Sequence, residues 1–333
     1  MLPAMHAMGT TSWKAGLPLA ALDLPTPAPG PREVRVAVHA IGVNPVDWKM
    51  RKQGPLRLAA RLIRPFRGPK GPVIVGVDFA GVVDAVGAKV TGLPVGTRVV
   101  GGTNFSRGQH GSYADTVVVR ADQVTALPDS VPFDVAAALP VAGVTAWMAL
   151  HDFRRAQPGR KVLVLGASGG VGQFAVQLAR RVCEADLVAG VCSSKNAELV
   201  RGLGAHVVID YGAGDPFAAA REHGPFDVIV DCVGTYPASK SRALLARGGR
   251  HVMVAGDGGG AMLQAMVPPF RSRLILGKPD GRHLAPLVAA VADGKLTVAI
   301  SERLPLAEAE RAHELSRTGR MNGKLVLLAR TAA

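Results

Sequence analysis

The 333-residue chain has few cysteines, few aromatic residues and no sign of export. Its three cysteines, Cys183, Cys192 and Cys232, form no CxxC pair and cannot close an even set of disulfides, which indicates a reduced, cytoplasmic setting. The N-terminus lacks the basic segment, apolar run and cleavage site of a secretory signal. The uncharged run 135–150 is too short, and too broken by Pro140, to cross a bilayer. We therefore expect no integral membrane segment.

Acidic residues are also scarce relative to basic ones. The chain has 25 Asp and Glu against 39 Lys and Arg, a net charge of +14. A surplus of this size would suit nucleic acid or an anionic membrane surface. However, only 5% of the residues are aromatic, and the cations are scattered rather than interleaved with stacking residues. We attribute the charge to a composition rich in Arg and Ala, and we expect no nucleic-acid partner.

Length and composition together indicate two folded domains, since a domain takes roughly 150 residues. Hydrophobic residues make up 48% of the chain, which is enough for a sizeable core. In the first part, short valine-rich runs bounded by Gly, Pro or Asn predict the strands of a small barrel or sandwich. These runs cover 33–43, 79–87, 97–102 and 112–119.

After Pro128 the pattern changes to apolar runs that alternate with helical stretches. Strands separated by such helices predict right-handed crossovers and a doubly wound parallel sheet, so the expected fold class is α/β. The last part of the chain predicts a helix over 307–316 and a final strand from Gly323. The strands of the sheet are expected to begin near Lys161, Leu187, His206, Phe226, Arg250 and Arg273.

The most specific motif is GASGGVG, residues 166–172, which follows an apolar strand and opens a helix. Glycines at such a turn let the backbone approach a pyrophosphate closely, and the free N–H groups of the helix start point at the phosphates. With further strand–helix units after it, the motif predicts a dinucleotide site. The expected contacts are Ser168, Gly169, Gly170, Val171 and Gly172.

The end of the second strand indicates which dinucleotide is bound. An NAD site would place an acid there for the ribose hydroxyls. The chain instead has Ser193, Ser194 and Lys195, which suit a 2′-phosphate, and Tyr211 can reach the adenosine end. This favours NADPH, although Lys195 can also be read as a solvated residue that opens the next helix.

Five motifs in order resemble the medium-chain dehydrogenase/reductase superfamily, in its zinc-independent quinone oxidoreductase (zeta-crystallin-like) branch. The resemblance covers nearly the whole chain. It implies a GroES-like β-barrel domain over 1–122, completed by 294–333, and a Rossmann NADPH-binding domain over 123–293. It also implies reduction of quinones or of double bonds conjugated to a carbonyl, and a homodimer. The motifs are GVNPVDWKMRKQG from Gly42, GVDFAGVVDAVG from Gly76, PVAGVTAWMAL from Pro140, the Gly166 loop and NGKLVLL from Asn322.

The zinc ligands of related alcohol dehydrogenases have no counterparts in this sequence. A catalytic zinc needs a Cys, a His and an acid in fixed places. The position compared with the cysteine is Asn44, and the Gly-His-Glu position reads Gly76, Val77, Asp78. Residues 101–112 contain no cysteine, so the structural zinc lobe is missing as well. We expect no metal site.

Without a metal, hydrogen-bond donors must polarise the acceptor carbonyl. Asn44 is the first candidate, although an Asn before Pro45 can also simply cap a turn. Thr145 resembles the family threonine near the nicotinamide, or is a small residue packed at a helix start. Trp48 stands where the family often has a tyrosine; it can stack on a flat substrate but is a poor proton source, so solvent is expected to supply the proton.

Further cofactor contacts are expected at strand ends and in the closing motif. Gly234 and Gly256 end the fourth and fifth strands of the sheet, where cofactor crevices form. The resemblance implies that Asn322 and Lys324 approach the nicotinamide end from the other domain. The segment 51–70 contains seven cations and no acid, and predicts either a basic amphipathic helix for an anionic partner or a solvated insertion.

The function expected from these features is a zinc-independent NADPH-dependent reductase of quinones or α,β-unsaturated carbonyls, working on small molecules between its domains. Two alternatives stay open. One is an enoyl-thioester reductase or alcohol-type dehydrogenase on the same scaffold, and the other is a non-catalytic NADPH-binding redox sensor. The physiological acceptor does not follow from the sequence, because irregular loops line its site.

Overall fold

The computed structural model divides by its contacts into two compact units. Unit 1 comprises Met1–Val141, Lys278–Ala292 and Ile300–Ala333, and unit 2 comprises Ala142–Gly277 and Asp293–Ala299. The predicted domain boundaries remain a prediction, because compact units are defined by contacts alone. The structure describes residues 4–12, 14, 16–51, 71–105, 108–151, 156–254, 271–275, 277, 280–319 and 321–329.

The described residues of unit 1 form two sheets whose strands are mostly antiparallel. The larger has the order β15-β16-β3-β5-β6-β8, with β7 paired to β3, and the smaller has the order β2-β1-β4. In the larger sheet β15 and β16 run parallel. The strands are β1 Ala4–Thr10, β2 Ala20–Pro25, β3 Glu33–Val43, β4 Val73–Ile74, β5 Asp78–Val86, β6 Arg98–Gly102, β7 Thr116–Arg120, β8 Val124–Ala126, β15 Ile300–Pro305 and β16 Lys324–Leu328.

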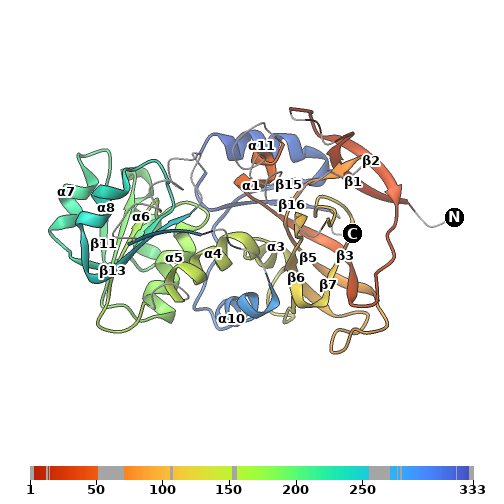
Figure 1. Cartoon of the computed structure of the whole chain (residues 1–333), viewed down its shortest axis with the longest axis horizontal. Coiled ribbons are helices and arrows are strands. Elements are labelled where there is room, and N and C mark those ends of the chain that lie inside the picture. Colours follow the sequence, from red (N-terminus) through yellow and green to blue (C-terminus); the bar gives the residue numbers. More distant parts are fainter. Residues whose placement is uncertain are drawn as a thin grey trace. The chain divides into compact units, whose positions relative to one another are not determined.

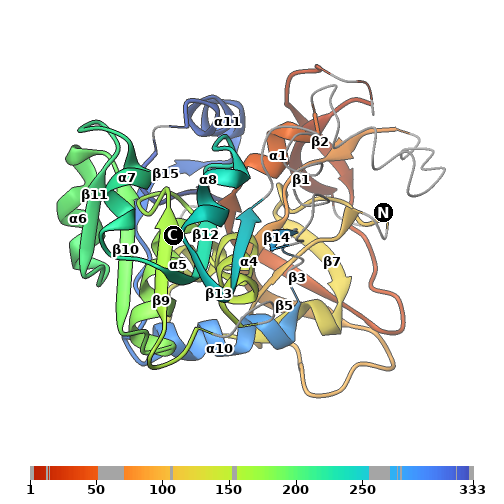
Figure 2. The same cartoon turned by 60° about the vertical axis from the view of Figure 1, so that its left-hand side comes forward.

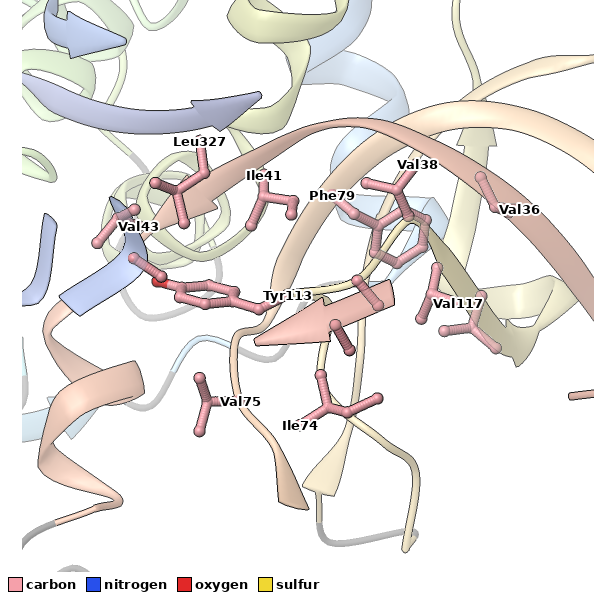
Figure 3. Packing of buried hydrophobic residues seen from close by; sticks show 14 of the residues in the cluster. Val36, Val38, Ile41, Val43, Ile74, Val75, Phe79, Tyr113, Val117 and Leu327 are labelled. Atoms are coloured by element: carbon pink, nitrogen blue, oxygen red, sulfur yellow. The ribbon is translucent and has the colours of Figure 1, made fainter. Parts of the chain in front are cut away.

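The core of unit 1 gathers apolar side chains from both sheets. Phe79 and Tyr113 are its largest fully buried residues. Figure 3 shows Phe79 beside Val38, and the Tyr113 ring among Ile41, Val43 and Val75. The long strand β3 therefore contributes to the core along much of its length, because alternate side chains of a strand point to one face.

The α-helices of the described part of unit 1 are α1 Pro45–Lys49, α3 Phe133–Ala137, α10 Gly281–Ala292 and α11 Ala309–Arg317. Helix α1 begins directly after β3 because Asp47 Oδ2 accepts the Asn44 backbone N–H and Pro45 fits the first helical turn. Although far apart in sequence, α1 and α11 lie side by side (Figure 1). This places the side chains at the end of β3 next to those of α11.

Unit 2 is a doubly wound parallel sheet, which confirms the predicted fold class. Its order is β11-β10-β9-β12-β13-β14, with β11 at the left in Figure 2. Strand β12 is buried along its whole length, as expected for a sheet covered on both faces. The elements are α4 Pro140–His151, β9 Lys161–Leu165, α5 Gly172–Gln177, β10 Leu187–Cys192, α6 Ala197–Gly202, β11 Val207–Asp210, α7 Pro216–Arg221, β12 Phe226–Asp231, α8 Ala238–Ala243, β13 Leu245–Val254 and β14 Ser272–Ile275.

The chain order along this sheet reverses between β9 and β12, and cofactors bind at the carboxyl ends of strands at such a point. The loops after these two strands meet there. A side chain at Gly166 would lie 3.0 Å from Cγ2 of Val233.

Some elements differ from the prediction. The strand expected from Ser112 begins at Thr116, because Tyr113 instead donates its N–H to Val75 and Ala114 bridges to Ala7. The N-terminal strands β1 and β2 were not predicted. The expected helix in 51–70 lies outside the described residues, apart from Arg51. Within the described part of the chain, every helix is too short or too polar to span a membrane.

Candidate functional site

The glycine-rich loop of unit 2 requires glycine at both of its ends, Gly166 and Gly172. It connects β9 to a continuous helical stretch from Gly172 to Val182, whose last turn is π-helical. Gly166 has a φ of +75°, which favours glycine. A Cβ on Gly172 would lie 2.1 Å from the carbonyl oxygen of Gly166. The backbone is thus open where a pyrophosphate would meet the helix start, and Ser168, Gly169, Gly170 and Val171 are half-buried around it. These residues fit a dinucleotide.

The predicted adenosine contacts also come together in unit 2. The ends of β10 and β11 pair with Cys192 opposite Asp210. Ser193, Ser194 and Lys195 follow the first of these strands, and Tyr211, which is 53% exposed, follows the second. Asn196 donates its side-chain N–H to Ser168 Oγ over 3.0 Å, which ties this turn to the glycine-rich loop.

Sequence reasoning missed Asp210 in this region. Its Oδ1 accepts the backbone N–H groups of Ser194, at 3.1 Å, and Gly212, at 2.9 Å. The sequence analysis considered an acid only at the end of the second strand, β10, whereas this carboxylate lies at the end of the third, β11. Asp210 could have been found from its position directly before Tyr211, which was itself a predicted adenosine contact.

Other predicted contacts of unit 2 have partners within that unit. The Gly234 N–H is donated to Asp231 Oδ1 over 2.9 Å. Thr145 is buried in α4, and a Cβ on Gly277 would come within 2.2 Å of its hydroxyl oxygen, so these two residues pack closely. Gly256 lies outside the described residues.

In unit 1, Asn44 belongs to a buried polar group that also contains Asp78 and Lys324, called here the Asn44 cluster. The Asn44 amide nitrogen donates to Asp78 Oδ2 over 2.8 Å, and Lys324 Nζ donates to the Asn44 amide oxygen. The ammonium also donates to the Val43 carbonyl, at 3.0 Å, and lies 3.8 Å from Asp78 Oδ2. The remaining Asp78 oxygen accepts the Val141 N–H. Both Asp78 oxygens and the Asn44 amide oxygen therefore accept hydrogen bonds, and one of the two amide hydrogens of Asn44 donates to Asp78.

Burial controls the ionisation of this cluster. It raises the pKa of Asp78 to about 6, against the opposing pull of the Lys324 ammonium and the hydrogen bond from Asn44. Burial likewise lowers the pKa of Lys324, and the charge of Asp78 works against this. At neutral pH Asp78 is therefore the ionised partner of the Asn44 amide.

A second layer of polar residues holds Asp47 beside the Asn44 cluster. Asp47 Oδ2 accepts the Asn44 backbone N–H at 2.8 Å and the Tyr113 hydroxyl at 3.2 Å. Tyr113 in turn lies 3.1 Å from His313 Nε2, and Arg51 lies 2.8 Å from His313 Nδ1. Since a guanidinium can only donate, Nδ1 accepts and Nε2 carries the proton, so the donors run in one direction towards Asp47.

Burial shifts the pKa values of the residues in this second layer. Burial lowers the pKa of His313 to about 3, so the imidazole is neutral. Burial also raises the pKa of Asp47 above its usual range. Arg51, the first cation of the predicted basic segment, pairs with Glu310 over 2.7 Å. The Arg51 charge is therefore paired with a carboxylate of unit 1.

The remaining predicted residues of unit 1 have separate places. Trp48 on α1 donates its indole N–H to Ser316 Oγ over 3.1 Å, which fixes the ring. Asn322 is exposed, whereas Lys324, only two residues later, is 3% exposed. The structure thus brings Asn44 and Lys324 together and separates Asn322 from them. The contribution of Tyr113 and His313 was not foreseen.

The two positions compared above with zinc ligands, Asn44 and Asp78, are bonded to each other and to an ammonium. In the part of the chain that the structure describes, no three His, Cys, Asp or Glu side chains gather where they could hold a metal ion. The positive charge next to the Asn44 and Asp78 oxygens is the Lys324 ammonium.

Known proteins match both parts of the chain. The family model described as "Alcohol dehydrogenase GroES-like domain" matches residues 30–129, and the model described as "Zinc-binding dehydrogenase" matches 203–327. The chloroplast envelope quinone oxidoreductase homolog of Arabidopsis thaliana is 33% identical over 335 residues, or 97% of this chain and 98% of its own length. A human mitochondrial NAD(P)H oxidoreductase is 37% identical over 218 residues, or 61% of this chain and 52% of its own.

A solved structure agrees with these relatives. The quinone oxidoreductase from Coxiella burnetii superposes with a TM-score of 0.85 at 30% identity, and the match covers 98% of this chain and 100% of that one. Together with the loop geometry and the strand order, these matches identify the family. The chain belongs to the medium-chain dehydrogenase/reductase superfamily, in its quinone oxidoreductase branch, and is an oxidoreductase.

Proposed function

We propose that the protein is an NADPH-dependent reductase that transfers hydride to quinones or to α,β-unsaturated carbonyl compounds without the help of a metal. The observation that carries this proposal is the Asn44 cluster. Its buried amide and carboxylate, Asn44 and Asp78, stand at positions compared with those of zinc ligands, and the Lys324 ammonium donates to the amide oxygen. The names of the relatives, quinone oxidoreductase and NAD(P)H oxidoreductase, support the reaction class.

The choice of NADPH rests on the turn after β10. Ser193, Ser194 and Lys195 offer two hydroxyls and an ammonium, and a phosphate forms strong charge-assisted hydrogen bonds with such groups. Lys195 is exposed and thus available to a ligand. We expect Lys195→Ala to weaken NADPH binding by about tenfold, or about 1.4 kcal/mol, and to leave NADH binding nearly unchanged. Fluorescence titration of both cofactors measures this, and equal losses would contradict the assignment.

The chain's own part in the reaction is to hold the acceptor oxygen. Bound NADPH supplies the hydride. As hydride arrives, negative charge develops on the oxygen of the quinone or enone, and a prearranged hydrogen-bond donor lowers the energy of that state. The Asn44 amide is this donor, and Trp48 offers a flat face for a planar acceptor. The proton that completes the reduction comes from solvent.

The acceptor class is tested by the loss of reduced nicotinamide absorbance. NADPH and NADH are compared against a simple quinone, an enone, an enal and an enoyl-CoA. Turnover of the quinone or enone with NADPH is the expected result. Turnover of the enoyl-CoA alone, or binding of NADPH with no acceptor reduced, would overturn the proposal.

We further propose that the protein works in the cytoplasm as a homodimer, with domains over 1–122 plus 294–333 and over 123–293. The family habit supports the dimer, and the free thiols of Cys183, Cys192 and Cys232 support a reduced compartment. Light scattering during size-exclusion chromatography measures the mass directly, and a mass near 34.5 kDa would contradict the dimer.

A further inference from the structure

The Asn44 carboxamide is held at both of its ends by side chains from distant parts of the sequence. Its oxygen accepts from Lys324 Nζ, and its nitrogen donates to Asp78 Oδ2 over 2.8 Å. Asn44 is 2% exposed, Lys324 3% and Asp78 0%. Water therefore cannot readily replace either partner, and the amide depends on these two residues for its orientation.

The chemistry of the two partners permits only one orientation. An ammonium can only donate hydrogen bonds, and an ionised carboxylate can only accept them. If the amide flipped, its NH2 group would face the Lys324 ammonium and its oxygen would face Asp78. Both contacts would then be repulsive, and both would lie in a buried environment where such repulsion is strong.

This orientation leaves one donor of Asn44 largely unused. The amide nitrogen carries two hydrogens, and Asp78 accepts one of them. The only other contact of the nitrogen within the described residues is with the Gly42 carbonyl, at 3.4 Å. That distance is long for an N–H···O hydrogen bond. A rigidly held but weakly engaged donor is suited to an oxygen on which charge develops.

We infer that Lys324 and Asp78 are positioning residues that fix the direction of the Asn44 amide and so keep its second N–H available for the acceptor oxygen. This inference deepens the proposed function and rests on it. Lys324 acts through Asn44, since its ammonium is buried and also bonds the Val43 carbonyl. This role differs from the cofactor contact that the closing motif predicts for Lys324.

The sharpest test exchanges the amide and the carboxylate. In the double variant Asn44→Asp/Asp78→Asn, the carboxylate at position 44 still accepts from Lys324. The amide at position 78 can donate to that carboxylate. It can also still accept the Val141 N–H, whose nitrogen lies 3.0 Å from Asp78 Oδ1 in the wild type. Charge, volume and hydrogen bonds are conserved, but the second N–H is no longer at position 44.

We expect this exchanged variant to unfold at the same urea concentration as the wild type and to bind NADPH equally well. Its kcat should fall at least about tenfold, because loss of one such donor typically costs a hundredfold or more. A purely structural role of the cluster would leave kcat unchanged. A wild-type kcat in the exchanged variant would therefore overturn the inference.

Lys324→Met tests the ammonium separately. We expect kcat to fall at least about tenfold while the NADPH dissociation constant changes less than about twofold. The opposite split, weaker NADPH binding at unchanged kcat, would show a cofactor contact and overturn the inference. Lys240→Met, at an exposed ion pair with Asp215, is the matched control and should change neither constant. If Lys324→Met does not fold, the exchanged variant decides.

A spectroscopic readout separates this inference from the proposed function. If the wild type reduces no acceptor, the proposed function fails, but the Asn44 amide can still be followed by NMR. Its side-chain resonances are assigned by their absence in Asn44→Asp. In the wild type their hydrogens should exchange slowly with solvent, and in Lys324→Met at least tenfold faster. Equal exchange rates in both proteins would overturn the positioning role.

Discussion

The attraction between Lys324 and Asp78 should be measurable as a coupling free energy. Their charged atoms lie 3.8 Å apart. At the effective dielectric constant of about 20 that suits protein sites, two unit charges at this distance attract by about 4 kcal/mol. Lys324→Met should reduce the free energy of unfolding by about 3–5 kcal/mol, because it leaves a buried carboxylate without its counterion. In an Asp78→Asn background the same change should cost at least about 2 kcal/mol less.

Urea unfolding of the wild type, the two single variants and the double variant at pH 7 gives this coupling. The ion pair of Lys240 and Asp215 is the control. It is shorter, at 3.1 Å, but its side chains are 49% and 47% exposed, so its coupling should not exceed about 1 kcal/mol. Additive effects at Lys324 and Asp78, within about 0.5 kcal/mol, would refute the electrostatic argument.

The same variants carry a pH dependence whose sign follows from burial. The pKa of Asp78 is about 6 in the folded protein and about 3.9 in an unfolded chain. Between these values the folded state holds the extra proton, so the free energy of unfolding falls as the pH rises from 4 to 7, by about 3 kcal/mol. Asp78→Asn should lack this part of the fall. A difference between wild type and Asp78→Asn that does not change with pH would contradict the assignment.

Three further substitutions test other parts of the structure. Tyr113→Phe removes a hydroxyl between two buried partners and should cost about 1–3 kcal/mol in urea unfolding, whereas Tyr211→Phe at an exposed site should cost almost nothing; equal effects would count against the buried network. Gly172→Ala should cost about 1–3 kcal/mol of stability and weaken cofactor binding in fluorescence titrations, because its Cβ would press on the Gly166 carbonyl; unchanged binding would argue against a phosphate at this loop. Asp210→Asn keeps the Oδ1 that accepts two backbone N–H groups but removes the charge. NADPH should then bind more tightly and NADH equally in the same titrations, because a carboxylate beside this turn repels a 2′-phosphate bound there, and an unchanged NADPH affinity would count against a 2′-phosphate at this turn.

The sheet of unit 2 and the long strands of unit 1 could be predicted because their patterns are local. Valine-rich runs such as β3 and β12 are bounded by turn residues, and the glycine-rich loop marks the first strand–helix crossover. The strands β1 and β2 escaped prediction. Their sequences, AMHAMGT and AALDLP, contain no Val, Ile, Phe, Tyr or Trp, which are residues that favour strands. They are held as strands because β1 pairs with β2 and with β4.

The residues of the candidate site could be predicted singly, but their contacts could not. Motifs drew attention to Asn44 and to Lys324, yet these residues are 280 positions apart and no local pattern indicates that they touch. The same holds for Tyr113 and His313, which are 200 positions apart. The contact of Asn44 with Lys324 arises from the pairing of β16 with β3, in which Leu325 lies opposite Val43.

If Asn44, Asp78 and Lys324 together take the place that a metal has in some dehydrogenases, the reaction needs no metal ion. The most direct measurement is the rate of NADPH oxidation by a quinone or enone, taken on protein whose metal content is determined before and after chelation. We predict the same kcat at less than one metal ion per hundred chains, with no gain on adding Zn²⁺. A rate that falls with the metal content and returns with Zn²⁺ would show that the reaction depends on a metal ion.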